Sequence, residues 1–365
     1  MSKARELASL GNAYSDGALS NRNLIINGAM QVAQRGTSAA TINTTTEVFR
    51  ADRFRFEQGG VMANNGTIEV AADAPTGFKY STKVTAGSSV SFNANGWCSV
   101  NYRIEGQDIE QLANGTASPQ PATLSFWVKS SVTGTYSINI TKYDGSIERF
   151  HVKTYTINSA NTWEYKTVTF DGDTSYSASS WMRLYWQLGG DSGAYNATAN
   201  TWVNGSATVR GVSAQANMIA TSGATFHLTG VQLEVGDTAT PLEHRSYGQE
   251  LALCQRFFWR IDYTQQYHPI LDPATVVNAN TVNGTYMFPS FMRAAPSILT
   301  SSAGTFRVNN YGADETASSV SFSYITNDRA RMTVLKPTSN MSSPAVGYIN
   351  TQDTLDAWIA GDAEL

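Results

Sequence analysis

Aromatic and polar side chains lie close together in one short stretch, SWMRLYWQLGGDSGAYNAT at 180–198, which runs into a glycine-rich loop. Aromatic rings can pack against the apolar face of a sugar ring while neighbouring polar groups hold its hydroxyls. Binding residues are often carried on loops that a rigid scaffold positions. The stretch therefore predicts a glycan-binding site, with the candidates Trp181, Arg183, Tyr185, Trp186, Gln187 and Asp191.

The aromatic residues also have a simpler structural interpretation. Trp and Tyr are large side chains that fill cores and subunit interfaces, and this role is favoured for any one of them taken alone. The stretch at 180–198 differs because it combines its rings with Arg, Gln and Asp beside a loop. The aromatic residues of interest in the first part of the chain are Trp97, Tyr102, Trp127, Trp163, Trp181, Tyr185, Trp186, Tyr195 and Trp202.

Sequence patterns that would indicate catalysis are weak. The chain contains no GxSxG, Walker or GxGxxG motif. Carboxylates two residues apart, such as Asp171 with Asp173 and Asp108 with Glu110, could serve a glycosidase or a calcium loop, but such pairs are common in turns. We expect no enzyme, no cofactor and no metal site. The histidines lack the spacing of a ligand pair; they are His151, His227, His244 and His268.

Charge and composition argue against several classes of partner. The chain has 365 residues and a formal net charge of -4, with no basic footprint that would indicate nucleic acid binding. Its longest apolar runs are far shorter than the roughly 20 residues that cross a bilayer, and its first residues lack the apolar core of a secretory signal peptide. We expect no nucleic acid partner, no membrane insertion and folding in a cytoplasm. Cys98 and Cys254 are expected to be buried thiols.

After the first 22 residues, short segments rich in Val, Ile, Thr and aromatic residues alternate with turn residues. This spacing is typical of an antiparallel β-sandwich or barrel. In ATLSFWVKS, Leu124, Phe126 and Val128 share one face, as expected for a strand with one buried side. The pattern predicts one large β-sandwich over 23–243 and a smaller one over 261–365.

An apolar helix is predicted between these regions, over 244–260. Pro241 disfavours helix at the residue before it, and Ser246 with Gln249 has the spacing of a capping box. The helix is apolar on more than one side, so we expect it to be enclosed between domains or subunits. Residues 1–22 are expected to form an arm that needs a partner surface. The candidate interface residues of the helix are Leu251, Leu253, Cys254, Phe257 and Phe258.

The predicted junction resembles a motif in virion proteins of tailed bacteriophages. In GVQLEVGDTATPLEHRSYGQELALCQRFFWR at 230–260, a strand of the type GVQLE-x-G-x-x-ATPFEHR leads into a helix of the type Y-x-x-EL-x-x-CQRYY. Leu242 replaces the usual Phe, and Phe257 replaces the usual Tyr. The matching positions are Gly230, Gln232, Leu233, Glu234, Gly236, Ala239, Thr240, Pro241, Glu243, Arg245, Glu250, Leu251, Cys254, Gln255 and Arg256.

Other segments are similar to the same group, whose members are mostly labelled tail fibre or receptor-binding proteins. NRNLIINGAMQVAQRGTS at 21–38 and ADRFRF at 51–56 resemble the opening of its jelly-roll domain. ATLSFWVKSS at 122–131 resembles a strand of that domain, and MFPSFMRAAPSI at 287–298 with the ending AWIAGDAEL resembles its C-terminal domain. The resemblance therefore spans most of the chain.

The resemblance implies an all-β fold: a large jelly-roll sandwich like that of carbohydrate-binding modules, a short connecting α-helix, and a smaller C-terminal β-sandwich. It implies a non-enzymatic homotrimer that is assembled in the host cytoplasm and belongs to the virion, with the tail as its expected place. The arm at 1–22 would attach to a phage tail or head protein, and a β domain would bind host surface polysaccharide. The alternatives are a capsid fibre, decoration or tail adaptor protein with a purely structural role, and a polysaccharide depolymerase.

Overall fold

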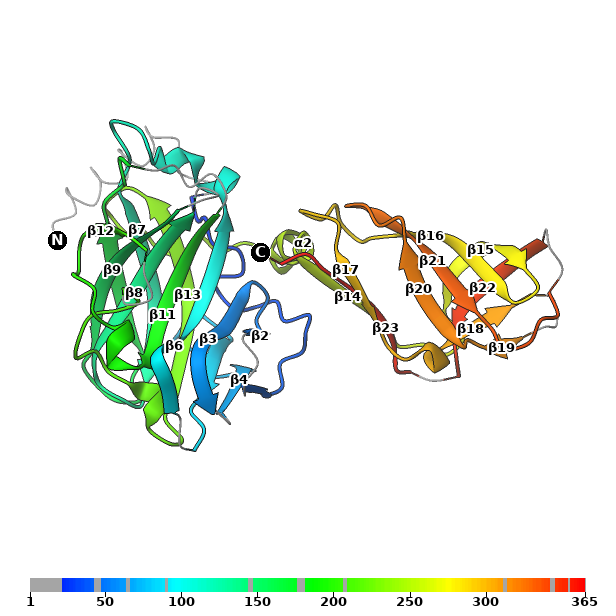
Figure 1. Ribbon diagram of the computed structural model, residues 1–365, viewed down its shortest axis with the longest axis horizontal. Coiled ribbons are helices and arrows are strands. Elements are labelled where there is room, and N and C mark those ends of the chain that lie inside the picture. The colour runs from blue at the N-terminus through cyan, green and yellow to red at the C-terminus, as the bar shows by residue number, and fades with distance from the viewer. Residues whose placement is uncertain are drawn as a thin grey trace. The chain divides into compact units, whose positions relative to one another are not determined.

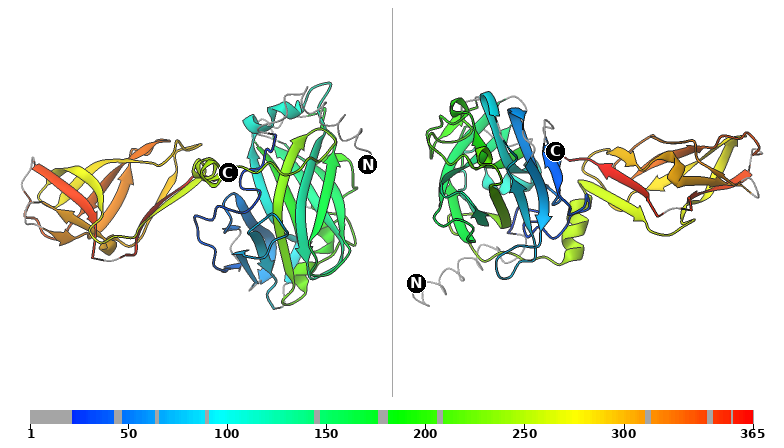
Figure 2. Two further views of the ribbon diagram at one scale, coloured as in Figure 1. Left: turned by 180° about the vertical axis from the view of Figure 1, so that it is seen from behind. Right: turned by 90° about the horizontal axis from the view of Figure 1, so that it is seen from below.

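The chain forms two compact units, Met1–Glu250 and Leu251–Leu365, coloured blue through green and yellow through red (Figures 1 and 2). The predicted arm at 1–22 lies outside the described residues, apart from Arg22. The computed structural model describes residues 22–42, 47–63, 66–88, 91–143, 147–175, 181–205, 209–310, 314–341, 345–353 and 355–364.

The first unit is an antiparallel β-sandwich of sheet A and sheet B (Figure 1). Sheet A has the strand order β1-β4-β5-β13-β7-β10, with β1 (Ala40–Ile42), β4 (Gly66–Ala71), β5 (Ser81–Thr85), β13 (Thr225–Val235), β7 (Ala122–Ser130) and β10 (Glu164–Phe170). Sheet B has the order β12-β9-β8-β11-β6-β3-β2, with β12 (Trp202–Asn204), β9 (Glu148–Ile157), β8 (Gly134–Tyr143), β11 (Trp181–Gly190), β6 (Ser91–Glu105), β3 (Phe54–Ala63) and β2 (Glu47–Phe49). Its loops carry the 3-10 helices η1 (Gly106–Leu112), η2 (Ser192–Ala194) and η3 (Met218–Ala220).

Alternation of apolar and polar residues along the strands places the core between sheets A and B. On β7, Leu124, Phe126 and Val128 are fully buried in this core, as the sequence predicts. Burial of each such side chain contributes roughly 1.5–3 kcal/mol relative to exposure. A register slip of one residue would turn this whole set toward solvent, so the apolar pattern specifies how the strands pair.

The connecting helix α2 spans Tyr247–Gln255 and begins at the predicted capping box. The backbone N–H of Ser246 donates to Oε1 of Gln249 at 3.0 Å, and the backbone N–H of Gln249 donates to Oγ of Ser246 at 3.4 Å. The predicted extent of 244–260 is wrong at its C-terminal end, because Phe258 already begins a strand. The run FFWRIDY is rich in aromatic residues, which favour strands, and tertiary pairing decides the outcome.

The second unit is also built from antiparallel sheets. One sheet has the order β14-β23-β17, with β14 (Phe258–Tyr263), β23 (Ala357–Asp362) and β17 (Ser297–Thr300). The other has the order β19-β18-β22-β15-β16-β21-β20, with β19 (Glu315–Thr316), β18 (Phe306–Asn309), β22 (Ala345–Thr351), β15 (Pro269–Asn278), β16 (Thr281–Met287), β21 (Arg329–Leu335) and β20 (Ser319–Ser323), and η4 (Ala303–Thr305) precedes β18. The predicted all-β fold, with a large sandwich, a short helix and a smaller β unit, is confirmed.

Candidate functional site

Strand β11 separates the predicted glycan-binding residues onto its two sides. Side chains alternate along a strand, and Met182, Leu184, Trp186 and Leu188 belong to the core between the sheets. The residues between them therefore point to the opposite side of sheet B, which we call the outer face. The candidates brought together on the outer face are Trp181, Arg183, Tyr185 and Gln187.

Trp186 does not fit the prediction of a glycan platform. Its side chain is completely buried, and its ring meets the ring of Phe126 edge-on with centroids 5.7 Å apart. Phe54 lies on another side, at 6.4 Å between centroids. The ring fills the space between the two sheets, so its assignment to the site is wrong. The sequence already indicates this burial, because Trp186 lies two residues from Leu184 and from Leu188 and so shares their side of the strand.

The centre of the outer face is a stack of half-buried side chains around Trp181. The ring of Tyr143 on β8 stacks on the ring of Trp181 at 5.0 Å between centroids with a 25° angle between planes. The guanidinium carbon of Arg183 lies 4.0 Å from the centroid of the Trp181 ring. Such cation–π contacts contribute about 0.5–2 kcal/mol, depending on exposure. The stack presents partly exposed aromatic edges together with a positive charge.

A second contact of the same kind lies on the other side of Tyr185. Arg183 donates from Nη1 to the hydroxyl of Tyr185 at 2.7 Å, and the ring of Trp97 on β6 meets the Tyr185 ring edge-on at 5.6 Å. The guanidinium of Arg210 lies 4.6 Å from the Trp97 centroid and 5.9 Å from the Tyr185 centroid. Burial raises the pKa of Tyr185, which keeps its phenol neutral. Tyr185 is therefore flanked by two arginine–tryptophan pairs.

Strands β3 and β6 extend the outer face with charged side chains that the sequence analysis did not select. Arg55 donates from Nε to Oδ1 of Asn101 at 2.9 Å and pairs with Glu57 at 3.2 Å and Glu47 at 3.1 Å. Arg103 pairs with Glu47 at 3.3 Å. Burial, with the nearby charge of Arg55, lowers the pKa of Arg103 to about 10, so it stays protonated at neutral pH. These residues lie beside the outer side of β11 because β6 pairs with β11 and β3 pairs with β6. No local sequence pattern indicates this pairing.

The last two candidates have supporting positions. Gln187 is completely buried on the outer face, and its Oε1 accepts from the Tyr195 hydroxyl at 3.4 Å. The backbone N–H groups of Asn95 and Gly193 each donate to Oδ2 of Asp191 at 3.0 Å, and these hydrogen bonds lower the pKa of Asp191. Asp191 therefore holds the loop that starts η2, which places it at the margin of the site.

The carboxylate pair at Asp171 and Asp173 does not form an acid–base site in this structure. Asp171 is exposed, whereas buried Asp173 pairs with Lys142 at 3.0 Å and Arg149 at 2.8 Å. Within the part of the chain that the structure describes, no group of three or more His, Cys, Asp or Glu side chains is placed to hold a metal ion. Among those same residues, no helix is long and apolar enough to span a bilayer.

The junction motif forms a second polar region, where the segment after Arg22 lies along strand β13. The N–H of Leu24 donates to the carbonyl of Leu233 at 3.0 Å, and the N–H of Val231 donates to the carbonyl of Gly28 at 3.0 Å. A Cβ on Gly28 would lie 2.0 Å from the carbonyl oxygen of Val231, so only glycine fits. NLIING and GVQLE, which both belong to the motifs quoted in the sequence analysis, thus lie against each other in one contact.

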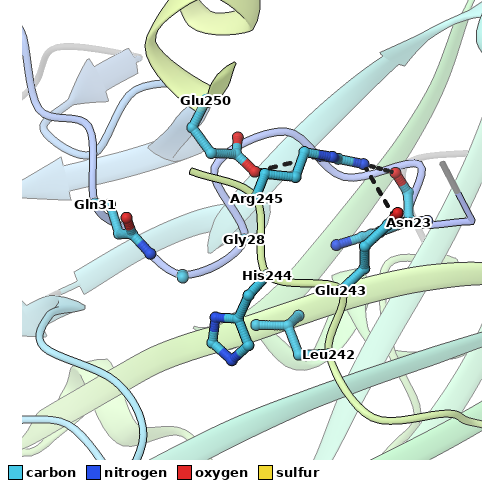
Figure 3. Close-up of a pocket in the computed structure, with 9 residues that line it drawn as sticks. Asn23, Gly28, Gln31, Leu242, Glu243, His244, Arg245 and Glu250 are labelled. Carbon is cyan, nitrogen blue, oxygen red and sulfur yellow. Dashed lines mark hydrogen bonds and ion pairs between the residues drawn. The ribbon is translucent and has the colours of Figure 1, made fainter. Parts of the chain in front are cut away.

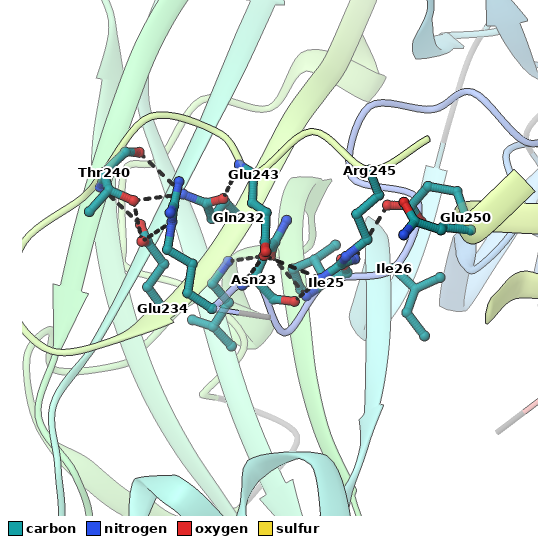
Figure 4. Close-up of polar contacts among 12 residues, drawn as sticks. Asn23, Ile25, Ile26, Gln232, Glu234, Thr240, Glu243, Arg245 and Glu250 are labelled. Carbon is teal, nitrogen blue, oxygen red and sulfur yellow. Dashed lines mark hydrogen bonds and ion pairs between the residues drawn. The ribbon is translucent and has the colours of Figure 1, made fainter. Parts of the chain in front are cut away.

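Arg245 and Glu250 hold this segment from the other side (Figure 4). Arg245 donates to the carbonyls of Asn23 and Ile25 and pairs with Glu250 at 3.3 Å. The other carboxylate oxygen of Glu250 accepts the N–H of Asn27 at 2.6 Å. Hydrogen bonds of this kind, with one charged partner, are stronger than neutral ones. They anchor the first turn of α2 to the first unit.

Four further motif residues fold the loop at 236–243 back onto β13 (Figure 4). Oε1 of Gln232 accepts the N–H of Glu243 at 2.7 Å, and Glu234 accepts the N–H of Thr240 at 3.0 Å. Arg22 pairs with Glu234 at 3.4 Å. We call the whole set the junction latch, which comprises Asn23, Asn27, Gln232, Glu234, Thr240, Glu243, Arg245 and Glu250.

A small pocket lies against the latch (Figure 3), and the latch supplies much of its wall. Asn23, Glu243, Arg245 and Glu250 are bound to protein atoms, as described above, so their polar groups are already engaged. The pocket therefore follows from the folding of the junction. Its lining comprises Asn23, Gly28, Ala29, Gln31, Leu242, Glu243, His244, Arg245 and Glu250.

The predicted interface residues of the helix differ in exposure. Cys254, Phe257 and Phe258 are buried, as expected for an enclosed apolar segment. Leu251 is half-buried, and Leu253 is 37% exposed. The prediction that a second subunit covers them stays a prediction.

No family model and no curated protein sequence matches the chain. Solved structures similar to part of it include carbohydrate-binding modules and a phage tailspike domain. The CBM22-1 xylan-binding domain from Paenibacillus barcinonensis is 13% identical with a TM-score of 0.28, over 60% of this chain and 96% of that one. The family 11 module of a Clostridium thermocellum cellulosomal cellulase is 12% identical with a TM-score of 0.27, over 58% and 99%. The enzymatically active domain of bacteriophage CBA120 tailspike protein 4 is 12% identical with a TM-score of 0.30, over 59% and 21%. At these values the similarities assign neither a ligand nor an activity.

Proposed function

We propose that this chain is a non-enzymatic protein that binds glycans through the outer face of sheet B. The observation that carries the proposal is the half-buried stack of Trp181, Tyr143 and Arg183. An aromatic surface offers an apolar contact to a sugar ring, and Arg103 and Glu47 beside it offer a donor and an acceptor for hydroxyls.

The wider role in the proposal is that of a homotrimeric tail fibre that attaches a tailed phage to host surface polysaccharide. Its support is the resemblance of the junction, the first strands and the C-terminal segment to phage virion proteins. The arm at 1–22 would join a tail or head protein, and partly exposed Leu253 would contact another subunit. A solution mass of three chains, and particles that lose the protein when residues 1–22 are deleted, are the expected results. A monomer, or a truncated chain that still joins the particle, would contradict this role.

The glycan-binding proposal is tested with the intact chain on an array of bacterial surface polysaccharides. Trp181→Ala should weaken binding to any positive polysaccharide about tenfold, because it removes the stacked ring. The matched control is Trp358→Ala in the second unit, where Arg260 lies 4.5 Å from the half-buried Trp358 ring. Equal losses in the two variants, or no binding by the intact chain, would reject the outer face as a glycan site.

A second candidate role, as a capsid fibre, decoration or tail adaptor protein, has its own supporting observation. Part of the outer face is closed by the chain itself, since Asn139 on β8 donates to the carbonyls of Val209 and Arg210 at 2.8 and 3.1 Å. The charged residues of β3 and β6 also bind one another. A reconstruction of the particle with the outer face covered by other virion proteins would favour this role over adhesion.

A further inference from the structure

Two arginines on the outer face have aromatic neighbours in place of carboxylates. Arg183 lies on Trp181 and Arg210 lies on Trp97, and Tyr185 is between the two pairs. Among the residues that the structure describes, neither guanidinium forms an ion pair. Both side chains are half-buried, so each charge is partly withdrawn from water. A partly desolvated charge without a counterion favours an anionic ligand.

Their neighbours on the same face are neutralised differently. Arg55 has Glu57 and Glu47 at 3.2 and 3.1 Å, and Arg103 shares Glu47 at 3.3 Å. Strand register sets Arg103 opposite Arg183. Glu47 and Glu57 therefore pair with Arg55 and Arg103 over β2, β3 and β6. Glu105 lies in register with Trp181, and no described carboxylate forms an ion pair with Arg183 or Arg210.

Unused hydrogen-bonding groups at this place are mainly donors. Nε of Arg183 and Nε of Arg210 are buried and have no hydrogen-bond partner among the described residues. Nε2 of the completely buried Gln187 has none either, and neither has Oγ of completely buried Ser99, which strand register sets opposite Gln187. A buried donor without an acceptor costs stability, and the donors of this group have no acceptor among the described residues.

The geometry points to an acidic saccharide as the ligand of the outer face, with its carboxylate or other oxyanion near Arg183 and Arg210 and its ring against the Trp181 stack. This inference rests on the proposed glycan-binding function and names its ligand class. The protein as a whole has a formal net charge of -4, so general attraction to polyanions does not account for it. The discriminating feature is local: two arginines held on aromatic rings.

The test compares polygalacturonate fragments with their methyl esters, because esterification removes the charge and keeps the sugar ring. Colominic acid, neutral dextran and dextran sulfate complete the panel. We expect binding to at least one acidic polysaccharide and at least tenfold weaker binding to its uncharged counterpart, here the methyl ester or the carboxyl-reduced polymer. Affinity should also fall as salt is raised from 50 to about 300 mM, since the contacts are partly exposed.

The variants are Arg183→Gln and Arg210→Gln, with Arg331→Gln as the matched control. Arg331 also lies on an aromatic ring, 4.5 Å from the Tyr324 centroid, but on the second unit. Each outer-face variant should weaken binding of the acidic polysaccharide about tenfold, whereas the control should leave it unchanged.

Three outcomes would overturn the inference. The first is that the chain binds a neutral polysaccharide as tightly as its acidic counterpart, and that Trp181→Ala weakens this binding. This result would overturn the inference and leave the glycan-binding function standing. The second is that dextran sulfate binds most tightly and that Trp181→Ala does not change its affinity. This result would overturn the inference, because it would indicate general binding of polyanions. No binding to any saccharide would overturn the inference together with the proposed function.

Discussion

The junction latch and the outer face are two polar regions of the same sandwich, and Arg245 of the latch has very different neighbours from Arg183 of the outer face. In the latch, Arg245 donates to two backbone carbonyls and to the carboxylate of Glu250, all of them fixed parts of the protein. On the outer face, Arg183 donates to one phenol oxygen and otherwise lies on the ring of Trp181. Residue type alone therefore does not separate a structural arginine from one that we propose to bind a ligand. The acceptors already present around the guanidinium make that distinction.

The largest expected effect concerns the latch. Arg245→Ala should lower the free energy of unfolding by about 3 kcal/mol, because the carboxylate of Glu250 and the carbonyls of Asn23 and Ile25 lose a charged donor. Urea denaturation followed by tryptophan fluorescence measures this loss. Exposed Arg331→Ala is the control and should change stability by less than about 0.5 kcal/mol. Similar stabilities for the two variants would contradict the structural role of Arg245.

Acid should affect stability and binding differently. Burial, together with nearby Lys153 for His151 and Lys129 for His227, lowers the pKa of each histidine to about 4. Both stay neutral in the folded chain but take up protons when unfolded, below about pH 6.5. Stability should therefore be complete at pH 7 and fall by about 1 kcal/mol per histidine at pH 5.5.

Glycan affinity measured on the still folded protein should change little over the same interval, because the proposed contacts use no histidine. Denaturation curves and binding isotherms at pH 7 and 5.5 make the comparison. If the free energy of unfolding were the same at pH 7 and 5.5, the predicted effect of the buried neutral histidines would be wrong. His151→Gln and His227→Gln together should flatten the stability profile.

Arg183→Gln should affect glycan binding more than stability, whereas Arg245→Ala should affect stability most. We expect the unfolding free energy to fall by about 1 kcal/mol, from the lost contacts with Trp181 and Tyr185, which is less than for Arg245→Ala because Arg183 pairs with no described carboxylate. The acidic glycan affinity should fall about tenfold. Urea denaturation and calorimetric titration on one preparation give both values. A large loss of stability in this variant would remove the contrast between the two regions.

The smallest expected effect is a gain. Glu47 is partly exposed at the edge of the outer face and pairs with Arg103 and Arg55, while Arg55 keeps Glu57. Glu47→Gln removes one negative charge from the approach to the site and should strengthen acidic glycan binding about two- to threefold. Titration at low salt detects such a change best. Unchanged affinity at 50 mM salt would place the bound anion beyond the reach of Glu47.

Local patterns in the sequence predict much of the fold and only part of the site. The capping box of Ser246 and Gln249 and the buried row on β7 are encoded by residues close in sequence, and both are confirmed. The alternation on β11 also carries the information that Trp186 is buried, although composition alone suggested otherwise. Local alternation is thus a better guide than the mere presence of an aromatic residue.

The remaining site residues depend on register between distant strands. Arg103 reaches Arg183 only because β6 pairs with β11 in one alignment, and Arg210 arrives on a loop that folds over sheet B. The end of α2 at Gln255 differs from the predicted end for a related reason. Phe258 pairs with Asp362 on β23, about a hundred residues later, and that pairing outweighs the helical pattern of the junction.

The junction latch also has a consequence for biosynthesis. Asn23 and Asn27 bind groups that lie 208 to 223 positions later in the chain, and β13, the last strand of the first unit, inserts between β5 and β7. Contacts of such long sequence separation form slowly. During synthesis, Asn23 and Asn27 must therefore wait without these partners until residues up to Glu250 have emerged from the ribosome. We expect the sandwich to close in a late, single step, in which the segment at 22–28 binds β13 and the residues up to Glu250.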